Sequence, residues 1–282
     1  MNQPFLGSSS GVPRQQLRSR RYRRLHRDVF VLTSLADSLA VQVEALLTAV
    51  PDAVLSHQTA ARLMALPVDD DRLLHITRPP KAGICERPGV RTHRRVLRED
   101  EVHEQQGRAL TRPERVFLDL APLLSHVELV VLADAVARRV GLAALTSRAA
   151  SATGARGVRR ARAALALADP ASDSPAETRT RLILHAAGFR ALRHGLDVSD
   201  PDGGWLARPD LADPVAKVAI QYDGLIHLGD HPEQRRADID RDELLRQHGW
   251  QVVVLTAVDL RHPQRMIDKV TAAYSRARRL QG

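Results

Sequence analysis

The chain has 282 residues, of which 44% are hydrophobic and 27% are charged, a balance that excludes an intrinsically disordered or collagen-like chain. At about 100–200 residues per domain, this length favours two domains. Lys and Arg number 42 against 33 Asp and Glu, a net charge of +9 that favours an anionic partner, although an arginine-rich composition can equally reflect a GC-rich genome. Because only 3% of residues are aromatic, any contact with nucleic acid is expected to be electrostatic rather than through base stacking.

The cellular compartment follows from the cysteine content and the hydropathy. Cys85 is the single cysteine, so an intrachain disulfide and a cysteine-built zinc site are excluded, and a reducing cytosol fits best. The longest apolar stretch, residues 129–137, is far shorter than the ~20 residues of a membrane helix. Arginines replace the apolar core that a signal peptide would need. We therefore expect a soluble, cytoplasmic protein with no membrane partner.

An arginine-rich segment, Pro13 to Val31, begins the first predicted module. A short helix over 14–18 followed by a strand would match the second half of a winged helix, in which basic residues lie against DNA phosphates. A solvated basic arm without a specific partner explains the same residues equally well. The candidate nucleic-acid contacts in this segment are Arg18, Arg20, Arg21, Arg23 and Arg24.

The next elements are predicted from apolar periodicity. Residues 39–50 and 57–66 have helical spacing, and residues 73–77 and 90–94 alternate as half-buried strands do. Ser56 precedes His57 and is interpreted as a helix N-cap rather than a catalytic serine, since adjacent helical positions point apart.

A run of helices is expected after residue 110. The Thr111-x-x-Glu114 spacing predicts a capping box at the start of a core helix. On that helix we expect Asp119 either to pair with a neighbour such as Arg115 or to face solvent. Two further helices are predicted over 127–138 and 158–168. The expected organisation is therefore a winged-helix-like module at 1–110, a helical connector at 111–173 and a third module at 174–282.

The order of helices and strands is predicted most clearly in the last module. We predict a helix over 176–187, a hairpin with strands 196–199 and 205–211, a strand over 217–223, a helix over 233–248, a strand over 250–256 and a final helix over 263–279. This is an αβββαβ order with one further helix. The fold class is therefore mixed α/β.

Four oxygen-bearing side chains are predicted to meet at one edge of this sheet. Gln221 and Asp223 lie on the same face of their strand, because side chains alternate. If the preceding strand pairs antiparallel, Asp210 falls near the same end, and Glu177 is one turn into the first helix. Carboxylate and amide oxygens are the ligands that Mg²⁺ or Mn²⁺ prefers, and such an ion lowers the pKa of an attacking water.

Each acid also has an ordinary structural explanation. Glu177 is a favourable negative charge in the first turn of a helix. Asp223 before Gly224 is a common turn residue. Their joint placement at one edge is what favours a site.

The C-terminal module resembles a known nuclease family over about residues 174–262. The residues that carry the resemblance are Glu177, the Arg-Pro-Asp ending at Asp210, Gln221-Tyr222-Asp223-Gly224 with His227, then Arg236, Asp238, Arg241, Asp242 and Gly249-Trp250. They resemble the endonuclease-like domain related to very-short-patch-repair (Vsr) endonucleases, a branch of the PD-(D/E)XK fold.

The resemblance implies a Mg²⁺- or Mn²⁺-dependent phosphodiesterase. Its catalytic residues would be Glu177, Asp210, Gln221, Asp223 and His227, and its metal ligands Asp210, Gln221 and Asp223. Arg236 and Arg241 would face the nucleic acid, and His227 and Arg241 would contact phosphate or transfer protons. Many relatives have Glu where this chain has Gln221, and no lysine stands at position 223.

The upstream region resembles actinobacterial proteins that join an AbiEi-like antitoxin region to this nuclease-like domain. The resemblance rests on residues 18–31, 55–61 and 110–115, with Asp119-Leu120-Ala121. It implies DNA binding and a possible toxin partner. Two functions therefore stay open: a metal-dependent DNA endonuclease or nickase, and an antitoxin-like or regulatory DNA-binding protein whose nuclease-like domain has lost its chemistry.

Overall fold

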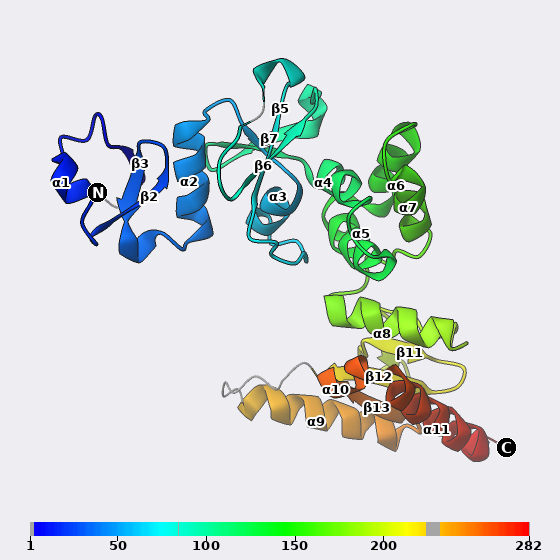
Figure 1. Ribbon diagram of the computed structural model, residues 1–282. Coiled ribbons are helices and arrows are strands. Elements are labelled where there is room, and N and C mark those ends of the chain that lie inside the picture. Colours follow the sequence, from blue (N-terminus) through cyan, green and yellow to red (C-terminus); the bar gives the residue numbers. More distant parts are fainter. Residues whose placement is uncertain (1–2, 84, 224–231, 282) are drawn as a thin grey trace. The chain divides into compact units, whose positions relative to one another are not determined.

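The computed structural model describes residues 3–83, 85–223 and 232–281 (Figure 1). The chain divides into two compact units, the first made of residues 1–124 and 152–161 and the second of 125–151 and 162–282. Both units contain helices and sheet, which confirms the mixed α/β class. None of the helices in the described part is both long and apolar enough to cross a lipid bilayer.

The helices expected to form a separate connector are divided between the two units. Helix α4 (Pro113–Leu120) belongs to the first unit, whereas α5 (His126–Val140) and α6 (Leu142–Ser151) belong to the second. Helix α7 (Val158–Leu165) contributes residues to both units. The two compact units therefore have other bounds than the three modules expected from the sequence.

The first unit begins with a small antiparallel sheet of order β1-β3-β2. Its elements are β1 (Phe5–Leu6), α1 (Arg14–Leu17), β2 (Tyr22–His26) and β3 (Val29–Leu32). A short 3₁₀ helix, η1 (Thr33–Leu35), and α2 (Leu39–Ala49) follow. The short helix and the strand expected after it are thus present, and β2 carries part of the arginine-rich segment.

A mixed five-stranded sheet of order β6-β5-β4-β8-β7 completes the first unit. Strand β5 pairs parallel to β6, and β4 pairs parallel to β8, while the other two pairings are antiparallel. Helices α3 and α4 pack against each other, and α3 also packs on β5. The elements are β4 (Val54–Leu55), α3 (His57–Leu63), β5 (Leu74–Arg78), η2 (Pro80–Ala82), β6 (Val90–Arg94), η3 (Glu99–Glu101), β7 (Val102–Gln105) and β8 (Arg108–Thr111).

Two details of helix capping differ from the sequence expectation. Thr111 ends strand β8, and the N-cap of α4 is Arg112, without a side-chain cap. The predicted capping box is therefore wrong, because the strand takes the threonine that would have capped the helix. Ser56 does occupy the N-cap position of α3, but its hydroxyl makes no cap hydrogen bond to the helix.

The second unit is built around a three-stranded sheet of order β11-β12-β13. Strand β11 pairs antiparallel to β12, and β12 pairs parallel to β13, with helix α9 in the crossover. The elements are α8 (Pro175–Ala186), β9 (Val198–Ser199), β10 (Trp205–Ala207), β11 (Leu211–Asp213), β12 (Val218–Asp223), α9 (Pro232–Gln247), β13 (Gln251–Thr256), α10 (Ala257–Arg261) and α11 (Pro263–Gln281).

Both faces of this sheet are covered (Figure 1). On one face, Val218 and Ile220 of β12 pack with Leu184 of α8 and Met266 of α11. On the other face, Ala219 packs with apolar residues of α9 and the strand ends, among them Leu245 and Trp250. Successive side chains of β12 therefore point to opposite faces of the sheet, as the sequence predicted, and pack in the two cores.

The predicted strand over 205–211 is two strands. Strand β10 ends at Ala207 and pairs with β9, whereas β11 begins at Leu211 and pairs with β12. Arg208-Pro209-Asp210 lies between them, and a proline interrupts a strand because it cannot donate to the ladder. The break leaves Asp210 directly before β11.

Candidate functional site

Asp210 is fixed at the end of β12 that carries Gln221 and Asp223. Leu211 pairs with Ile220 in the antiparallel ladder, which places the preceding residue beside the last residues of β12. The backbone N–H of Tyr222, between Gln221 and Asp223, donates to Oδ2 of Asp210 at 2.6 Å. The structure therefore has the antiparallel pairing on which the sequence argument depended.

Glu177 reaches the same region from helix α8. Its Oε2 lies 4.0 Å from Nδ1 of His194, and that same nitrogen lies 2.7 Å from the main-chain oxygen of Asp210. One imidazole thus lies between the Glu177 carboxylate and the main chain of Asp210. Glu177 also acts as a negative charge in the first turn of the helix. Its Oε2 accepts from the Asp173 N–H, and its own N–H donates to Ser174 Oγ at the helix start.

His194 is a residue that the sequence reasoning missed. Its side chain is fully buried, and since Nδ1 faces a carbonyl oxygen it carries the proton and donates to it. Nε2 is buried with no hydrogen-bond partner among the described residues. Burial lowers the pKa of His194, against the opposing effects of Asp169 and the Asp210 carbonyl. A lone histidine in a loop between two predicted elements gave no pattern by which to find it.

A buried carboxylate, Asp134 of α5, holds the start of α8 in place. Its oxygens accept from Thr178 Oγ1 at 2.7 Å, from the Asp169 N–H at 2.7 Å and from Arg181 Nη2 at 3.0 Å. Burial raises the pKa of Asp134, while these three donors act to lower it. Since Thr178 follows Glu177 directly, this network positions the first turn of α8.

The other predicted residues of this site differ in exposure. Gln221 is half-buried and Asp223 is exposed. On α9, Arg236 is exposed and Arg241 is half-buried. His227 lies outside the described residues.

Among the described residues, Glu177, Asp210 and Asp223 do not form a group whose ligand oxygens all lie within 4.8 Å of one another. Among the residues that the structure describes, a single group of three His, Cys, Asp or Glu side chains has ligand atoms all within 4.8 Å of one another, and it contains neither Glu177, Asp210 nor Asp223. These acids are instead linked through His194 and the backbone of Tyr222.

The five N-terminal arginines, Arg18, Arg20, Arg21, Arg23 and Arg24, form a second predicted feature, called here the arginine segment. All five are exposed, on β2 and just before it. Arg23 pairs with Asp37 at 2.9 Å, and Arg21 lies 5.7 Å from the centre of the Tyr22 ring. The segment is therefore placed to meet an anionic surface.

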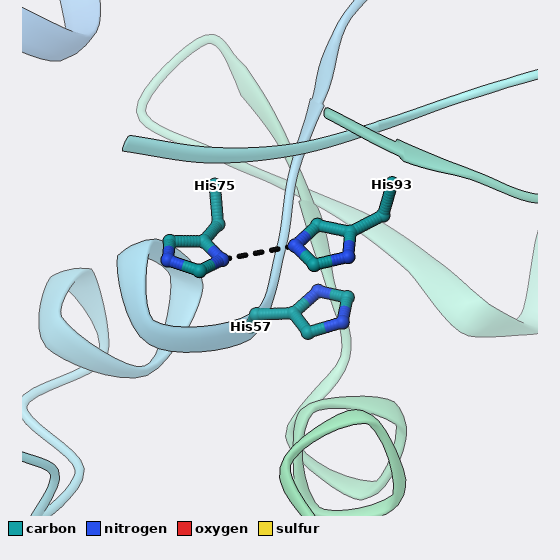
Figure 2. A group of neighbouring side chains, drawn as sticks. All are labelled: His57, His75 and His93. Carbon is teal, nitrogen blue, oxygen red and sulfur yellow. Dashed lines mark hydrogen bonds between the residues drawn. The ribbon is translucent and has the colours of Figure 1, made fainter. Parts of the chain in front are cut away.

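The group of three converging side chains lies in the first unit and consists of His57, His75 and His93. His57 begins α3, and the other two lie on the paired strands β5 and β6. Figure 2 shows the His57 ring against that of His93, with His75 joined to His93 by a hydrogen bond. The His57 and His93 rings stack at 3.5 Å between centroids, and His75 Nδ1 lies 2.9 Å from His93 Nε2.

Burial favours the neutral form of all three imidazoles. Burial, together with the neighbouring histidines, lowers the pKa of His57 to about 2. Burial and His75 lower the pKa of His93 to about 4. Burial also lowers the pKa of His75, against the opposing effect of Asp71. Neutral imidazole is the form that binds metals.

A pocket of about 780 Å³ adjoins this cluster within the first unit. His57 and His93 line it, together with Asp119 and five arginines, which are Arg91, Arg94, Arg95, Arg115 and Arg156. Asp119 is buried and bonded to Arg115, which confirms the paired alternative expected from the sequence. The lining therefore carries an excess of positive charge.

Sequence reasoning missed the cluster because its members stand 18 residues apart on three different elements. The available signal was that His75 and His93 each fall within a predicted strand. The parallel register that places Thr77 opposite His93 could not be read from the pattern.

Comparison with known proteins adds relatives but no function. No family model matches the chain. Two proteins of Mycobacterium tuberculosis are each 27% identical to it over 232 residues, which cover 78% of this chain and 80% of each relative. They are uncharacterized protein MT2308 of strain CDC 1551 / Oshkosh and uncharacterized protein Rv2248 of strain ATCC 25618 / H37Rv.

Proposed function

We propose that the second unit is a metal-dependent DNA endonuclease or nickase of the Vsr-like PD-(D/E)XK type. The observation that carries the proposal is the 2.6 Å hydrogen bond from the Tyr222 N–H to the Asp210 carboxylate. It ties the acid directly before β11 to the end of β12 that bears Gln221 and Asp223. Glu177 reaches the same place through His194.

The donor set suits the implied ion in its chemistry. Carboxylate and amide oxygens are hard ligands of the kind that Mg²⁺ or Mn²⁺ binds. Asp210, Gln221 and Asp223 would hold the ion, with Glu177 and His227 as further catalytic residues. When bound, the ion would polarise the phosphodiester and lower the pKa of an attacking water.

The chain's own residues orient this donor set. His194 donates to the Asp210 main-chain oxygen and, being buried, holds the loop before β11 in one position. The Asp134 network does the same for the first turn of α8. Arg236 and Arg241 of α9 supply positive charge for the nucleic-acid backbone.

The test is nicking of supercoiled plasmid with Mg²⁺ or Mn²⁺. Asp210→Asn keeps an oxygen that can accept from Tyr222 but removes the charge, so we expect cleavage to fall by 10²-fold or more while folding is retained. The matched control is Asp202→Asn, since Asp202 is an exposed acid in a turn of the same unit. Plasmid that stays intact at high protein concentration, or equal cleavage by Asp210→Asn and wild type, contradicts the proposal.

A second candidate is an AbiEi-like antitoxin or DNA-binding regulator whose nuclease-like unit is catalytically weakened. Two observations favour it: the arginine segment is exposed, and Gln221 gives the site one negative charge fewer than a glutamate would. It predicts DNA binding without cleavage. The resemblance also implies a toxin partner, which a neighbouring nucleotidyltransferase gene would support.

Salt dependence separates specific contacts of the arginine segment from general attraction. Each phosphate contact that is lost flattens the slope of log K against log salt concentration by about 0.9. Arg20→Ala/Arg21→Ala should therefore flatten the slope by about 2. The matched control is Arg278→Ala/Arg279→Ala, which removes the same charge from exposed positions of α11. Equal slopes for both variants would exclude a DNA-binding role for the arginine segment.

A further inference from the structure

We propose that His57, His75 and His93 bind a divalent transition-metal ion of the zinc type, and that the ion's remaining coordination positions face the arginine-lined pocket, where a phosphate-bearing ligand completes the site. This site lies in the first unit and does not depend on the nuclease proposal. Three histidines with an open fourth position are a common arrangement for a reactive zinc ion.

The hydrogen bonds of His75 favour ligation. Its Nε2 lies 2.7 Å from Asp71 Oδ2, so Nε2 carries the proton and donates to the carboxylate. The lone pair is then on Nδ1, which accepts from the Nε2–H of His93 at 2.9 Å (Figure 2). An ion between the two rings would replace that proton. A carboxylate that fixes the outer nitrogen of a histidine in this way is the usual second contact of a metal-binding imidazole.

His57 is fixed in a comparable manner. Its Nδ1 lies 3.0 Å from Ser56 Oγ and 3.9 Å from Asp119 Oδ2. The acidic neighbour favours a proton on Nδ1 and leaves Nε2 as the ligand atom. Ser56 Oγ is itself held by Thr77 Oγ1 at 2.9 Å. His57 also has a φ of +50°, an uncommon conformation for a non-glycine residue that tends to occur at functional sites.

Binding requires one of the two stacked rings to rotate. The His57 and His93 rings are within 10° of parallel, and an ion in the plane of one would lie outside the plane of the other. Two nitrogens bound to one tetrahedral zinc at about 2.0–2.1 Å stand roughly 3.3 Å apart, against 2.9 Å between His75 and His93. The first condition is met if one ring turns out of the stack so that its nitrogen points at the ion, and the second if His75 and His93 separate by a few tenths of an ångström.

The charge around the cluster determines what else binds. Five arginines line the pocket, and a dication alone is disfavoured beside them. Asp119 offsets Arg115 through their direct contact, and Asp71 lies against His75. Arg91, Arg94 and Arg95 are exposed on and beside β6. An anion that contacts both the ion and these guanidinium groups removes the repulsion, and phosphate matches their planar donors.

The experiment uses the full chain without a histidine tag, freed of metal by a chelator. Zn²⁺ is titrated in competition with a chromophoric chelator, and Co²⁺ binding is followed by its visible spectrum. We expect one tight site per chain, and the X-ray absorption of the zinc form should show three imidazole ligands. Fewer than three imidazoles, or binding no tighter than free histidine gives, would overturn the proposal without any variant.

Variants assign the site to these residues. His93→Ala should abolish tight binding, and Asp71→Asn should weaken it by about 10–100-fold. The control is His103→Ala, a histidine of the same sheet outside the cluster. If His93→Ala does not fold, His75→Gln provides the same test. Wild-type affinity in the cluster variants, or its loss in the control, would reject the assignment.

A final experiment tests whether a phosphate-bearing ligand completes the site. Phenyl phosphate should raise the apparent Zn²⁺ affinity of the wild type by 10-fold or more, and it should do so less for Arg94→Ala. No effect of phenyl phosphate on the wild type would overturn the phosphate part of the proposal, while the metal site would stand on the titration alone.

Discussion

Removal of the Asp134 carboxylate should destabilise the second unit strongly. Asp134 is 2% exposed and accepts from Thr178, Asp169 and Arg181. Asp134→Ala leaves the Arg181 guanidinium, which is 5% exposed, without its counter-charge. Loss of one partner of a buried ion pair costs about 3–5 kcal/mol. With a urea m-value of about 2 kcal/mol/M, the midpoint should fall by roughly 2 M.

Tryptophan fluorescence is the suitable assay, because both tryptophans of the chain, Trp205 and Trp250, lie in the second unit. Trp250 is 6% exposed, so its emission changes when the unit unfolds. Urea denaturation followed by this signal reports the second unit alone and avoids the error of fitting two units as one transition.

Two further variants decide whether the reasoning is right. Glu128→Ala removes a bidentate partner of Arg179 between the same two helices, α5 and α8, but at about one-third exposure, so it should cost no more than about 1 kcal/mol. Replacing both Asp134 and Arg181 by leucine should cost much less than Asp134→Ala, since no buried charge remains. Equal costs for Asp134→Ala and Glu128→Ala, or a double variant as unstable as the single, would refute the argument.

Three further predictions concern the metal, pH and backbone. Gln221→Glu should lower the Mg²⁺ concentration for half-maximal plasmid cleavage by about 10-fold, because it restores a charged ligand; an unchanged value would remove Gln221 from the metal site. Burial raises the pKa of Asp259, but hydrogen bonds from Lys269, Thr256 and Arg265 lower it to about 2 from 3.8. That stabilisation, about 2 kcal/mol, is therefore present above about pH 4 and lost as the pH falls toward 2, and in urea titrations Asp259→Asn should lack this loss. Gly157→Ala places a Cβ 2.7 Å from the Pro122 nitrogen at a φ of +81°, so it should lower the first unit's thermal midpoint in circular dichroism and leave the tryptophan transition unchanged.

Local patterns predicted most of the elements because each depends on neighbours in the chain. Apolar spacing located the helices at 39–49, 175–186 and 263–281 and the strands at 74–78 and 90–94 to within a few residues. Errors occurred where tertiary contacts decide. Pro209 divides one predicted strand, and Thr111 is used by a ladder rather than by a helix cap.

The candidate sites also depend on tertiary contacts that local patterns do not predict. The position of Asp210 near Gln221 and Asp223 was predictable, since a turn at Asp213-Pro214 fixes which residues of the two adjacent strands lie opposite each other. His194 was not, because its role depends on a loop that no periodicity describes. The histidine cluster depends on the parallel pairing of β5 with β6, and a parallel register is set by the whole sheet rather than by a turn.

The two proposed sites differ in ligand chemistry, and this makes them separable in one protein. Oxygen ligands select Mg²⁺ or Mn²⁺, whereas imidazoles select zinc-type ions. Plasmid cleavage that responds to Mg²⁺ should therefore be lost in Asp210→Asn and kept in His93→Ala, while Zn²⁺ affinity should show the opposite pattern. If instead His93→Ala abolished cleavage and Asp210→Asn did not, the chemistry of this chain would have to be sought at the histidines.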